Sequence, residues 1–258
     1  MFVTTAGRTN EELTYKAKMI ASELKAEFVP RKKRSVSAIQ DIHHDDCLVV
    51  GKERLELFPL GEKEPFFFHP NSAMFRIKRL MKGESDPLIE AAGLETGMSF
   101  LDCSLGLGSD SIVASFAVGE TGSVMGVEAR PELAYLVKKG LKAWDSGYQE
   151  INQAMSKIEV IQGYSLNVLK RQEDRSVDCV YFDPMFDESI LESDGIRGLS
   201  HFAVYEGLSK ETLDEAIRVA RKRVILKDHF RSNRFAEFGF KVHRRKSSKF
   251  HFGVIERE

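Results

Sequence analysis

Residues 99–110 read Ser-Phe-Leu-Asp-Cys-Ser-Leu-Gly-Leu-Gly-Ser-Asp, and this stretch decides the fold. A short apolar run ends in Asp102, a turn with Gly106 and Gly108 follows, and a helix-like segment begins near Ser109. A strand, a glycine-rich turn and a helix in this order predict a small-molecule site at the carboxyl end of a first parallel strand.

The acids around this turn indicate which small molecule binds. The dinucleotide fingerprint asks for Gly or Ala three residues after its second Gly, where this chain has Ser111. Asp110 would stand at the helix N-terminus, where an anion repels phosphate. Glu128 follows Gly108 by twenty residues and suits two ribose hydroxyls. Together with Asp102, these acids predict a slot for a cofactor with positive charge, a ribose and no phosphate, which describes S-adenosylmethionine.

A second informative stretch, residues 177–186, reads Val-Asp-Cys-Val-Tyr-Phe-Asp-Pro-Met-Phe. A buried-strand pattern ends in Asp183, Pro184 makes a turn, and the aromatic Phe186 follows. On a fourth strand, Asp183 would face the same crevice as the glycine turn and accept the N–H of an exocyclic amine. Phe186 can stack on a flat base, a contact worth about 1–3 kcal/mol. We predict that Asp183, Pro184 and Phe186 form the catalytic site.

Composition bounds the protein class. The chain has 258 residues, 42% hydrophobic and 30% charged, with a net charge of −1. These values are ordinary for a globular protein, and no apolar run is long enough for a membrane span. The three cysteines form no Cys-x-x-Cys pair, which predicts no metal and a reducing, cytoplasmic location. At this net charge, any RNA affinity must come from local patches.

The chain divides into two expected parts. Residues 1–70 predict a small α+β appendage, with a strand over 2–5, a helix from Asn10 to Leu24 and a hairpin formed by 47–50 and 54–58. Its basic run at 31–34 makes it a candidate RNA contact. Residues 71–258 predict the domain that binds S-adenosylmethionine.

The second part alternates strand-like and helix-like segments. Strands are expected at 98–102, 123–128, 157–162, 177–182 and 222–227, and helices at 71–81, 87–92, 109–118, 131–144 and 208–220. Two further strands, 238–243 and 250–256, flank a polar turn. This pattern predicts an α/β fold: a doubly wound, mostly parallel, seven-stranded methyltransferase sheet with a C-terminal antiparallel hairpin.

The chain resembles the family of small-subunit ribosomal RNA methyltransferase J, which transfers methyl from S-adenosylmethionine to a guanine exocyclic amine. The matching stretches are 55–57, 73–78, 102–110, Glu128, 165–166, 181–186 and 222–227. The resemblance implies that the cofactor contacts Ser109, Asp110, Glu128, Ala129, Tyr164, Ser165 and Asp183, beside the predicted Asp102, Gly106 and Gly108. It also implies RNA of the small ribosomal subunit as the partner.

Three alternatives stay open. A nucleotide-dependent oxidoreductase is disfavoured by Asp110 and Ser111. A non-catalytic RNA-binding protein could keep the fold without turnover. A methyltransferase acting on a small molecule or a protein is kept open by the acidic segment 187–194, which is unfavourable beside RNA. The oligomeric state is not indicated by the sequence.

Overall fold

The computed structural model describes residues 1–184, 208–245 and 248–257, which form two compact units. The first unit contains residues 1–68. The second contains the described residues from His69 onward.

The first unit is a four-stranded sheet with the order β2-β1-β3-β4. Strands β1 (Phe2–Thr5) and β3 (Cys47–Val50) are parallel, and β4 (Leu55–Phe58) returns antiparallel to β3, which confirms the hairpin. The remaining elements are α1 (Glu11–Glu23), β2 (Glu27–Phe28) and α2 (Val36–His43). Asn10 caps α1 by accepting the Leu13 N–H, as its residue type predicts.

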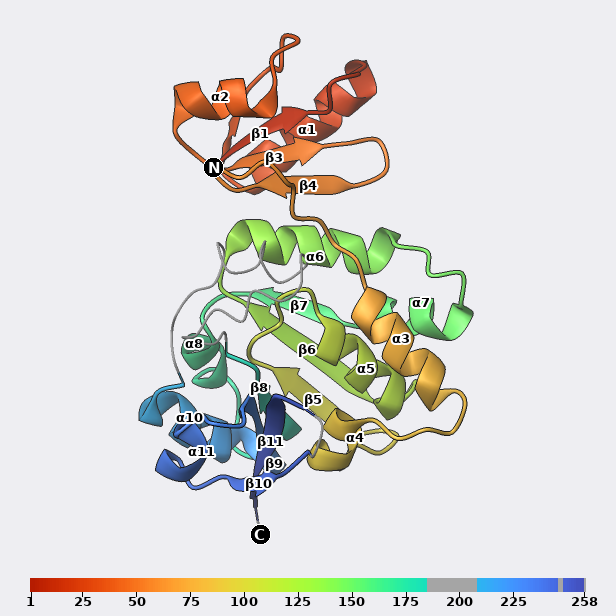
Figure 1. Ribbon diagram of the computed structural model, residues 1–258, viewed down its shortest axis with the longest axis vertical. Helices are drawn as coiled ribbons and strands as arrows, with labels where there is room; N and C mark the ends of the chain where they lie inside the picture. The colour runs from red at the N-terminus through yellow and green to blue at the C-terminus, as the bar shows by residue number, and fades with distance from the viewer. Residues whose placement is uncertain (185–207, 246–247, 258) are drawn as a thin grey trace. The chain divides into compact units, whose positions relative to one another are not determined.

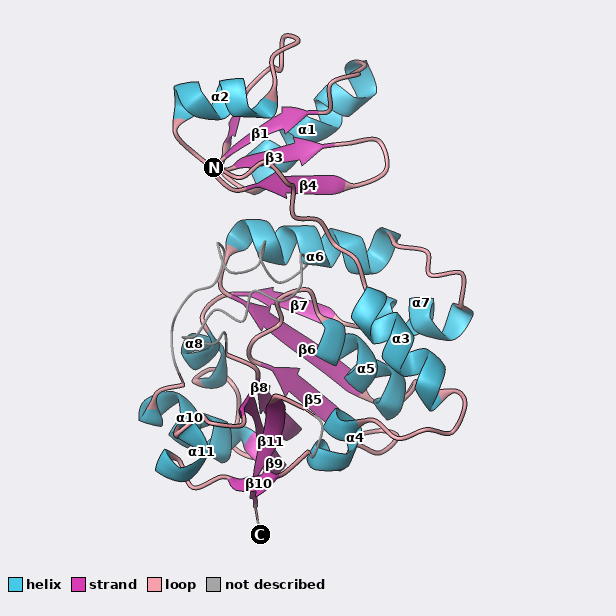
Figure 2. Ribbon diagram, viewed as in Figure 1, coloured by secondary structure: helices cyan, strands magenta, loops and turns pink. Residues whose placement is uncertain are grey.

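The second unit is a seven-stranded sheet with the order β10-β11-β9-β8-β5-β6-β7 (Figures 1 and 2). Its strands are β5 (Ser99–Asp102), β6 (Ser123–Glu128), β7 (Glu159–Gln162), β8 (Val177–Phe182), β9 (Ala220–His229), β10 (Lys241–His243) and β11 (Phe250–Glu256). The helices that the structure describes here are α3 (Asn71–Leu80), α4 (Pro87–Ala92), α5 (Ser109–Val118), α6 (Pro131–Ala143), α7 (Gln149–Ser156), α8 (Ser165–Leu169), α10 (Lys210–Val219) and α11 (Arg234–Glu237). Strands β5 to β9 are parallel and the two C-terminal strands are antiparallel, which confirms the predicted fold class.

The chain order places a crevice at the middle of this sheet. From β5 the chain runs outward to β6 and β7, then crosses back to β8 and β9 on the other side of β5. Ligands of open α/β sheets bind at such a switch point, beyond the carboxyl ends of the strands. Helices α4, α5 and α7 lie on one face and α8, α10 and α11 on the other (Figure 1). Both faces are therefore covered, which is why β8 is a nearly continuous apolar run.

One local expectation was wrong in its extent, and three short helices were not predicted. The predicted strand 238–243 is shorter in the structure, where only Lys241–His243 form β10. Arg234–Glu237 form a helical turn before it, and Gly239, at φ +74°, changes the direction of the chain. Phe235 and Phe240 both enter the core here. Helices α2, α7 and α8 were not expected, since each is short and its apolar period covers barely two turns.

Candidate functional site

The Ser104 hydroxyl links the carboxyl ends of β5 and β8 by hydrogen bonds. The backbone N–H of Asp183, directly after β8, donates to Ser104 Oγ over 2.6 Å. That hydroxyl donates to Asp102 Oδ1, at the end of β5, over 3.2 Å. Ser111 Oγ in α5 donates to the other Asp102 oxygen over 2.6 Å. The two acids that the sequence singled out at strand ends therefore border the same crevice.

The glycine turn between β5 and α5 has the backbone that only glycine adopts readily. Gly106 and Gly108 have φ of +49° and +75°, and Gly108 is the N-cap of α5. The turn is fixed to β6 by the Leu105 N–H, which donates to the Val127 carbonyl over 3.0 Å. A Cβ at Gly126 would lie 2.4 Å from the Leu105 side chain, so a larger residue in β6 would force that leucine to move.

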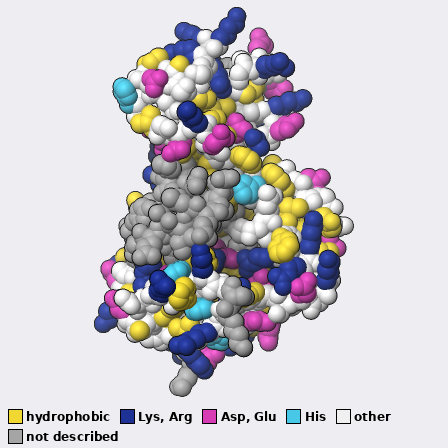
Figure 3. Space-filling model, in the orientation of Figure 1, with side chains coloured by type: hydrophobic (Ala, Val, Ile, Leu, Met, Phe, Trp, Pro, Cys, Tyr) yellow, Lys and Arg dark blue, Asp and Glu magenta, His cyan; other side chains and the backbone are white. Residues whose placement is uncertain are grey.

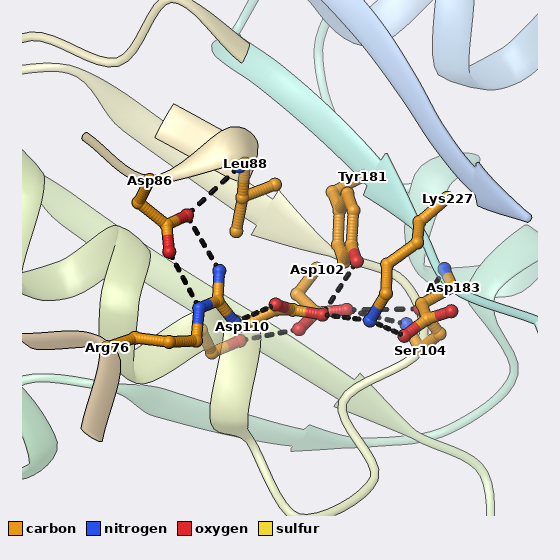
Figure 4. A network of polar contacts seen from close by, with 10 residues as sticks. Arg76, Asp86, Leu88, Asp102, Ser104, Asp110, Tyr181, Asp183 and Lys227 are labelled. Carbon is orange, nitrogen blue, oxygen red and sulfur yellow. Dashed lines mark hydrogen bonds and ion pairs between the residues drawn. The ribbon is translucent and has the colours of Figure 1, made fainter. Parts of the chain in front are cut away.

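Asp110, in the first turn of α5, is the centre of a buried polar network (Figure 4). Its Oδ1 pairs with Arg76 of α3. Its Oδ2 accepts the Tyr181 hydroxyl over 2.7 Å and the Lys227 ammonium over 3.0 Å. Lys227 donates in addition to Asp183 Oδ2 over 2.6 Å. One lysine at the end of β9 thus bridges the glycine-turn helix and the end of β8.

The network continues to a helix cap on its other side. Arg76 donates through Nε and Nη2 to both oxygens of Asp86, each over 2.8 Å. Asp86 Oδ1 also accepts the Leu88 N–H and so caps α4. A two-bond Arg–carboxylate pair has a fixed geometry, so these contacts fix the positions of α3, α4 and α5 relative to one another at the site.

Opposite charges in the network shift the pKa values of their neighbours and keep them ionised. Burial alone would raise the pKa of the Asp110 carboxyl, but Lys227 and Arg76 outweigh it and hold that pKa well below its ordinary value. Burial alone would lower the pKa of Lys227, but Asp110 and Asp183 raise it above its ordinary value. Both groups are therefore ionised at neutral pH.

The network as a whole carries an excess of negative charge. The cations Arg76 and Lys227 face the carboxylates Asp86, Asp110 and Asp183, so two positive and three negative formal charges leave a sum of −1. Asp110 lies at the predicted turn, and Arg76 and Lys227 compensate its charge. The attraction for a cation comes from the whole network.

Asp102 and Asp183 differ from Asp110 in the direction of their pKa shifts. Burial raises the pKa of Asp102 to about 7, although the hydrogen bonds from Ser111 and Ser104 oppose the rise. Burial also raises the pKa of Asp183, with the charge of Lys227 acting against it and that of Asp110 adding to it.

The ends of β6 and β7 bring the remaining predicted residues together. Glu128 Oε1 accepts the Arg130 N–H over 3.0 Å, and burial raises the pKa of this carboxyl despite that bond. The Gly163 N–H donates to the Glu128 carbonyl over 2.9 Å, which fixes the next loop beside it. Tyr164 is the N-cap residue of α8, directly before Ser165, and its side chain is 46% exposed.

The sequence prediction covered part of this site. Residues at the ends of β5, β6, β7 and β8 gather as expected, and Pro184 lies half-buried after Asp183. Phe186 and the acidic segment 187–194 lie outside the described residues. Arg76, Tyr181 and Lys227 were not predicted as site residues. The signal for Lys227 was present, since it is a charged residue following the buried Val224–Leu226 run.

Neither a metal centre nor a membrane-spanning helix is found among residues 1–184, 208–245 and 248–257. They contain no group of three His, Cys, Asp or Glu side chains arranged to hold a metal ion. No helix in the described part of the chain has the length and apolarity needed to cross a membrane.

Comparison with known proteins gives consistent matches. Residues 33–251 match the family described as "Putative SAM-dependent methyltransferase", where SAM is S-adenosylmethionine. "Uncharacterized protein YpiP" of Bacillus subtilis is 48% identical over 254 residues, 98% of each chain. Proteins named "Ribosomal RNA small subunit methyltransferase J" from Pseudomonas syringae and Coxiella burnetii are 25% and 27% identical. These matches cover 73% and 86% of this chain and 72% and 87% of the relatives.

A solved structure has the same fold. The crystal structure of a SAM-dependent methyltransferase from Neisseria gonorrhoeae superimposes with a TM-score of 0.66 and 18% identity, over 99% of this chain and 96% of that one.

Proposed function

The chain belongs to the SAM-dependent methyltransferase family, and from that premise we propose that it methylates the exocyclic amine of a guanine in ribosomal RNA. SAM is its cofactor. The observation that carries the proposal is the carboxylate of Asp183 at the end of β8: Lys227 binds this carboxylate, and the Ser104 hydroxyl accepts the backbone N–H of the same residue.

The side chains at the crevice fit SAM. The network has a formal sum of −1, which suits a ligand with a positively charged sulfur. Glu128 at the end of β6 would hold the ribose hydroxyls, and Tyr164 and Ser165 would lie along the adenine. Gly106, Gly108, Ser109 and Ala129 would approach the cofactor through their backbone.

Asp183 would act on the acceptor. Lys227 binds its Oδ2 atom, which leaves Oδ1 to accept one N–H of a planar amine. When bound, SAM supplies a methyl group that leaves its sulfur with the bonding electrons left behind, while the amine nitrogen forms the new bond and gives up one proton. Asp183 would orient the nitrogen lone pair and take that proton. Such positioned proton transfer contributes about 10²–10⁴ in rate.

Lys227 and Pro184 would position this carboxylate. Lys227 binds Oδ2 through a charge-assisted hydrogen bond, which is shorter and stronger than a neutral one. The fixed φ of Pro184 ends the strand and sets the direction of the following turn. Phe186 of that turn would stack on the base, as the sequence predicts.

The choice of RNA rests on the relatives named ribosomal RNA methyltransferase J and on the Asp-Pro-Met-Phe sequence at 183–186. A ribosomal RNA acceptor also implies a role in rRNA processing, in the cytoplasm. A small-molecule or protein acceptor, or RNA binding without turnover, would be the competing outcomes.

The test is to incubate purified protein with methyl-labelled SAM and total extract from a strain that lacks the gene, and then to separate RNA, protein and small molecules. We expect label in RNA, and none with Asp183→Ala. Label only in protein or small molecules would replace the RNA acceptor, and cofactor binding without any label would indicate a non-catalytic protein.

A further inference from the structure

A partly exposed group of aromatic side chains lies just after the end of β9 and is separate from the charge network. It surrounds a cavity of about 470 Å³. We call it the Phe230 pocket; its walls include Phe230, Phe235, Phe240, Val242, Arg244 and His251. The volume lies in the range of small-ligand pockets, and apolar walls with one cation at the rim suit a flat ring that carries a negative group.

The ring of Phe230 is partly exposed and has aromatic and cationic side chains beside it. Its side chain is 45% exposed. The rings of His229 and His251 have centroids 4.6 Å and 6.2 Å from it, and the Arg231 guanidinium lies 5.1 Å from its centroid. Nucleobases stack on exposed aromatic rings of this kind without sequence preference, and Arg adds a cation–π contact.

The turn that carries Phe230 is fixed before any ligand arrives. The Phe230 N–H donates to the Lys249 carbonyl over 2.9 Å. The buried Asp228 accepts the Ser232 hydroxyl over 2.6 Å and Arg234 over 3.1 Å. Because the turn is already ordered, its backbone loses little conformational freedom on binding, and more of the stacking energy appears as affinity.

The charge of this region is complementary to a phosphate backbone. Residues 228–251 contain seven Lys or Arg and two Asp or Glu, a net charge of +5 in a chain whose total is −1. In Figure 3, dark blue, cyan and yellow side chains meet over the region of α11, β10 and β11. Arg244, at the end of β10, is exposed and lines the pocket, so one phosphate could pair with it.

The pocket is close in sequence to the methylation site. Lys227, which binds Asp183, and Phe230 are three positions apart, and Phe230 is the first residue after the end of β9; three residue steps span about 10 Å at most. A single-stranded segment whose amine reached Asp183 could therefore place a neighbouring base on Phe230.

We propose that the Phe230 pocket binds a nucleotide of single-stranded RNA that flanks the methylated base, with the base on Phe230 and its phosphate on Arg244. This inference rests on the proposed RNA acceptor.

The test measures binding of a short fluorescein-labelled oligoadenylate by anisotropy, at low salt and without SAM. Phe230→Ala should weaken binding about 5- to 150-fold, whereas Phe230→Trp should retain it. Tyr148→Ala is the matched control, because Tyr148 is 41% exposed and has Lys78 4.4 Å from its ring, and it should bind like the unaltered protein. Arg244→Ala should reduce the salt slope of log K by about 0.7.

Calorimetry with SAM on each variant confirms that the site is folded. Equal affinity of Phe230→Ala and Tyr148→Ala for the oligonucleotide would overturn the pocket, as would absence of binding by the unaltered protein. Phe230-dependent binding together with no methyl label in RNA would leave the pocket standing and reject the proposed acceptor.

Discussion

The Lys227 ammonium lies 2.6 Å from Oδ2 of Asp183, and the two residues come from the ends of neighbouring parallel strands. The last register pair of these strands is Phe182 with Leu226, so Asp183 and Lys227 stand one step beyond it. The same ammonium contacts Asp110 of the glycine-turn helix. A single cation thus joins the end of β8 to α5, the helix that follows the glycine turn.

Removing this cation should destabilise the fold. Lys227→Ala leaves the buried Asp110 and the half-buried Asp183 without their shared partner; breaking a fully buried pair typically costs about 3–5 kcal/mol, and the partial exposure of Asp183 reduces this cost. Urea unfolding should show a lower midpoint. Lys222→Ala is the control, because Lys222 is exposed on the same strand and should leave the midpoint unchanged. Equal stability of the two variants would show that the network does not depend on Lys227.

Glu128 should determine binding of the ribose. Glu128→Ala removes charge-assisted hydrogen bonds, each worth about 1.5–3 kcal/mol, so calorimetry should show SAM affinity reduced by roughly 10- to 150-fold. Glu120→Ala, an exposed acid that follows α5, is the control. Tighter binding of NAD than of SAM by the unaltered protein would contradict the assignment of the slot.

The charge of Asp110 should distinguish the cofactor from its demethylated product. Asp110→Asn changes the network sum from −1 to zero, which weakens attraction for the positively charged sulfur of SAM but not for the neutral sulfur of the product. SAM affinity should therefore fall further than product affinity in a paired titration. Equal losses would reject the electrostatic explanation while leaving the site in place.

Asp102 should make stability depend on pH. Its pKa of about 7 in the folded protein exceeds the ordinary 3.8, so between these values the folded state binds more protons than the unfolded chain. Its contribution to stability is therefore complete below about pH 4 and decreases as pH rises towards 7, by at most about 1.4 kcal/mol per pH unit. Asp102→Asn should remove this decrease.

The measurement is urea unfolding of the unaltered protein and Asp102→Asn at about pH 5 and about pH 7, compared as a difference between the two proteins. A difference that stays constant with pH would mean that Asp102 is ionised throughout this range.

The strand ends were predictable because each acid follows its own buried strand in the sequence. Asp102 and Asp183 are preceded by apolar runs, and parallel strands end at one edge of a sheet. The same argument placed Glu128 correctly at the end of β6. The position of each acid depends only on the strand that it directly follows, so the sequence was sufficient to predict it.

The partners of Asp110 were not predictable in this way. Arg76 lies on α3, where a charged residue usually faces solvent, and it reaches Asp110 only because α3 packs on α5. Tyr181 is an aromatic residue inside a strand, which normally indicates core packing and not a hydroxyl contact. Contacts of this kind depend on packing between elements that are distant in sequence.

The central claim is that Asp183 supports methylation of a guanine amine in ribosomal RNA. The most direct measurement is mass spectrometry of nucleosides from the ribosomal RNA of a strain that lacks the gene, complemented with the unaltered protein or with Asp183→Ala. The account predicts that one N-methylated guanosine is lost in the deletion, returns with the unaltered protein and stays absent with Asp183→Ala. An unchanged nucleoside profile in the deletion strain, or full restoration by Asp183→Ala, would contradict it.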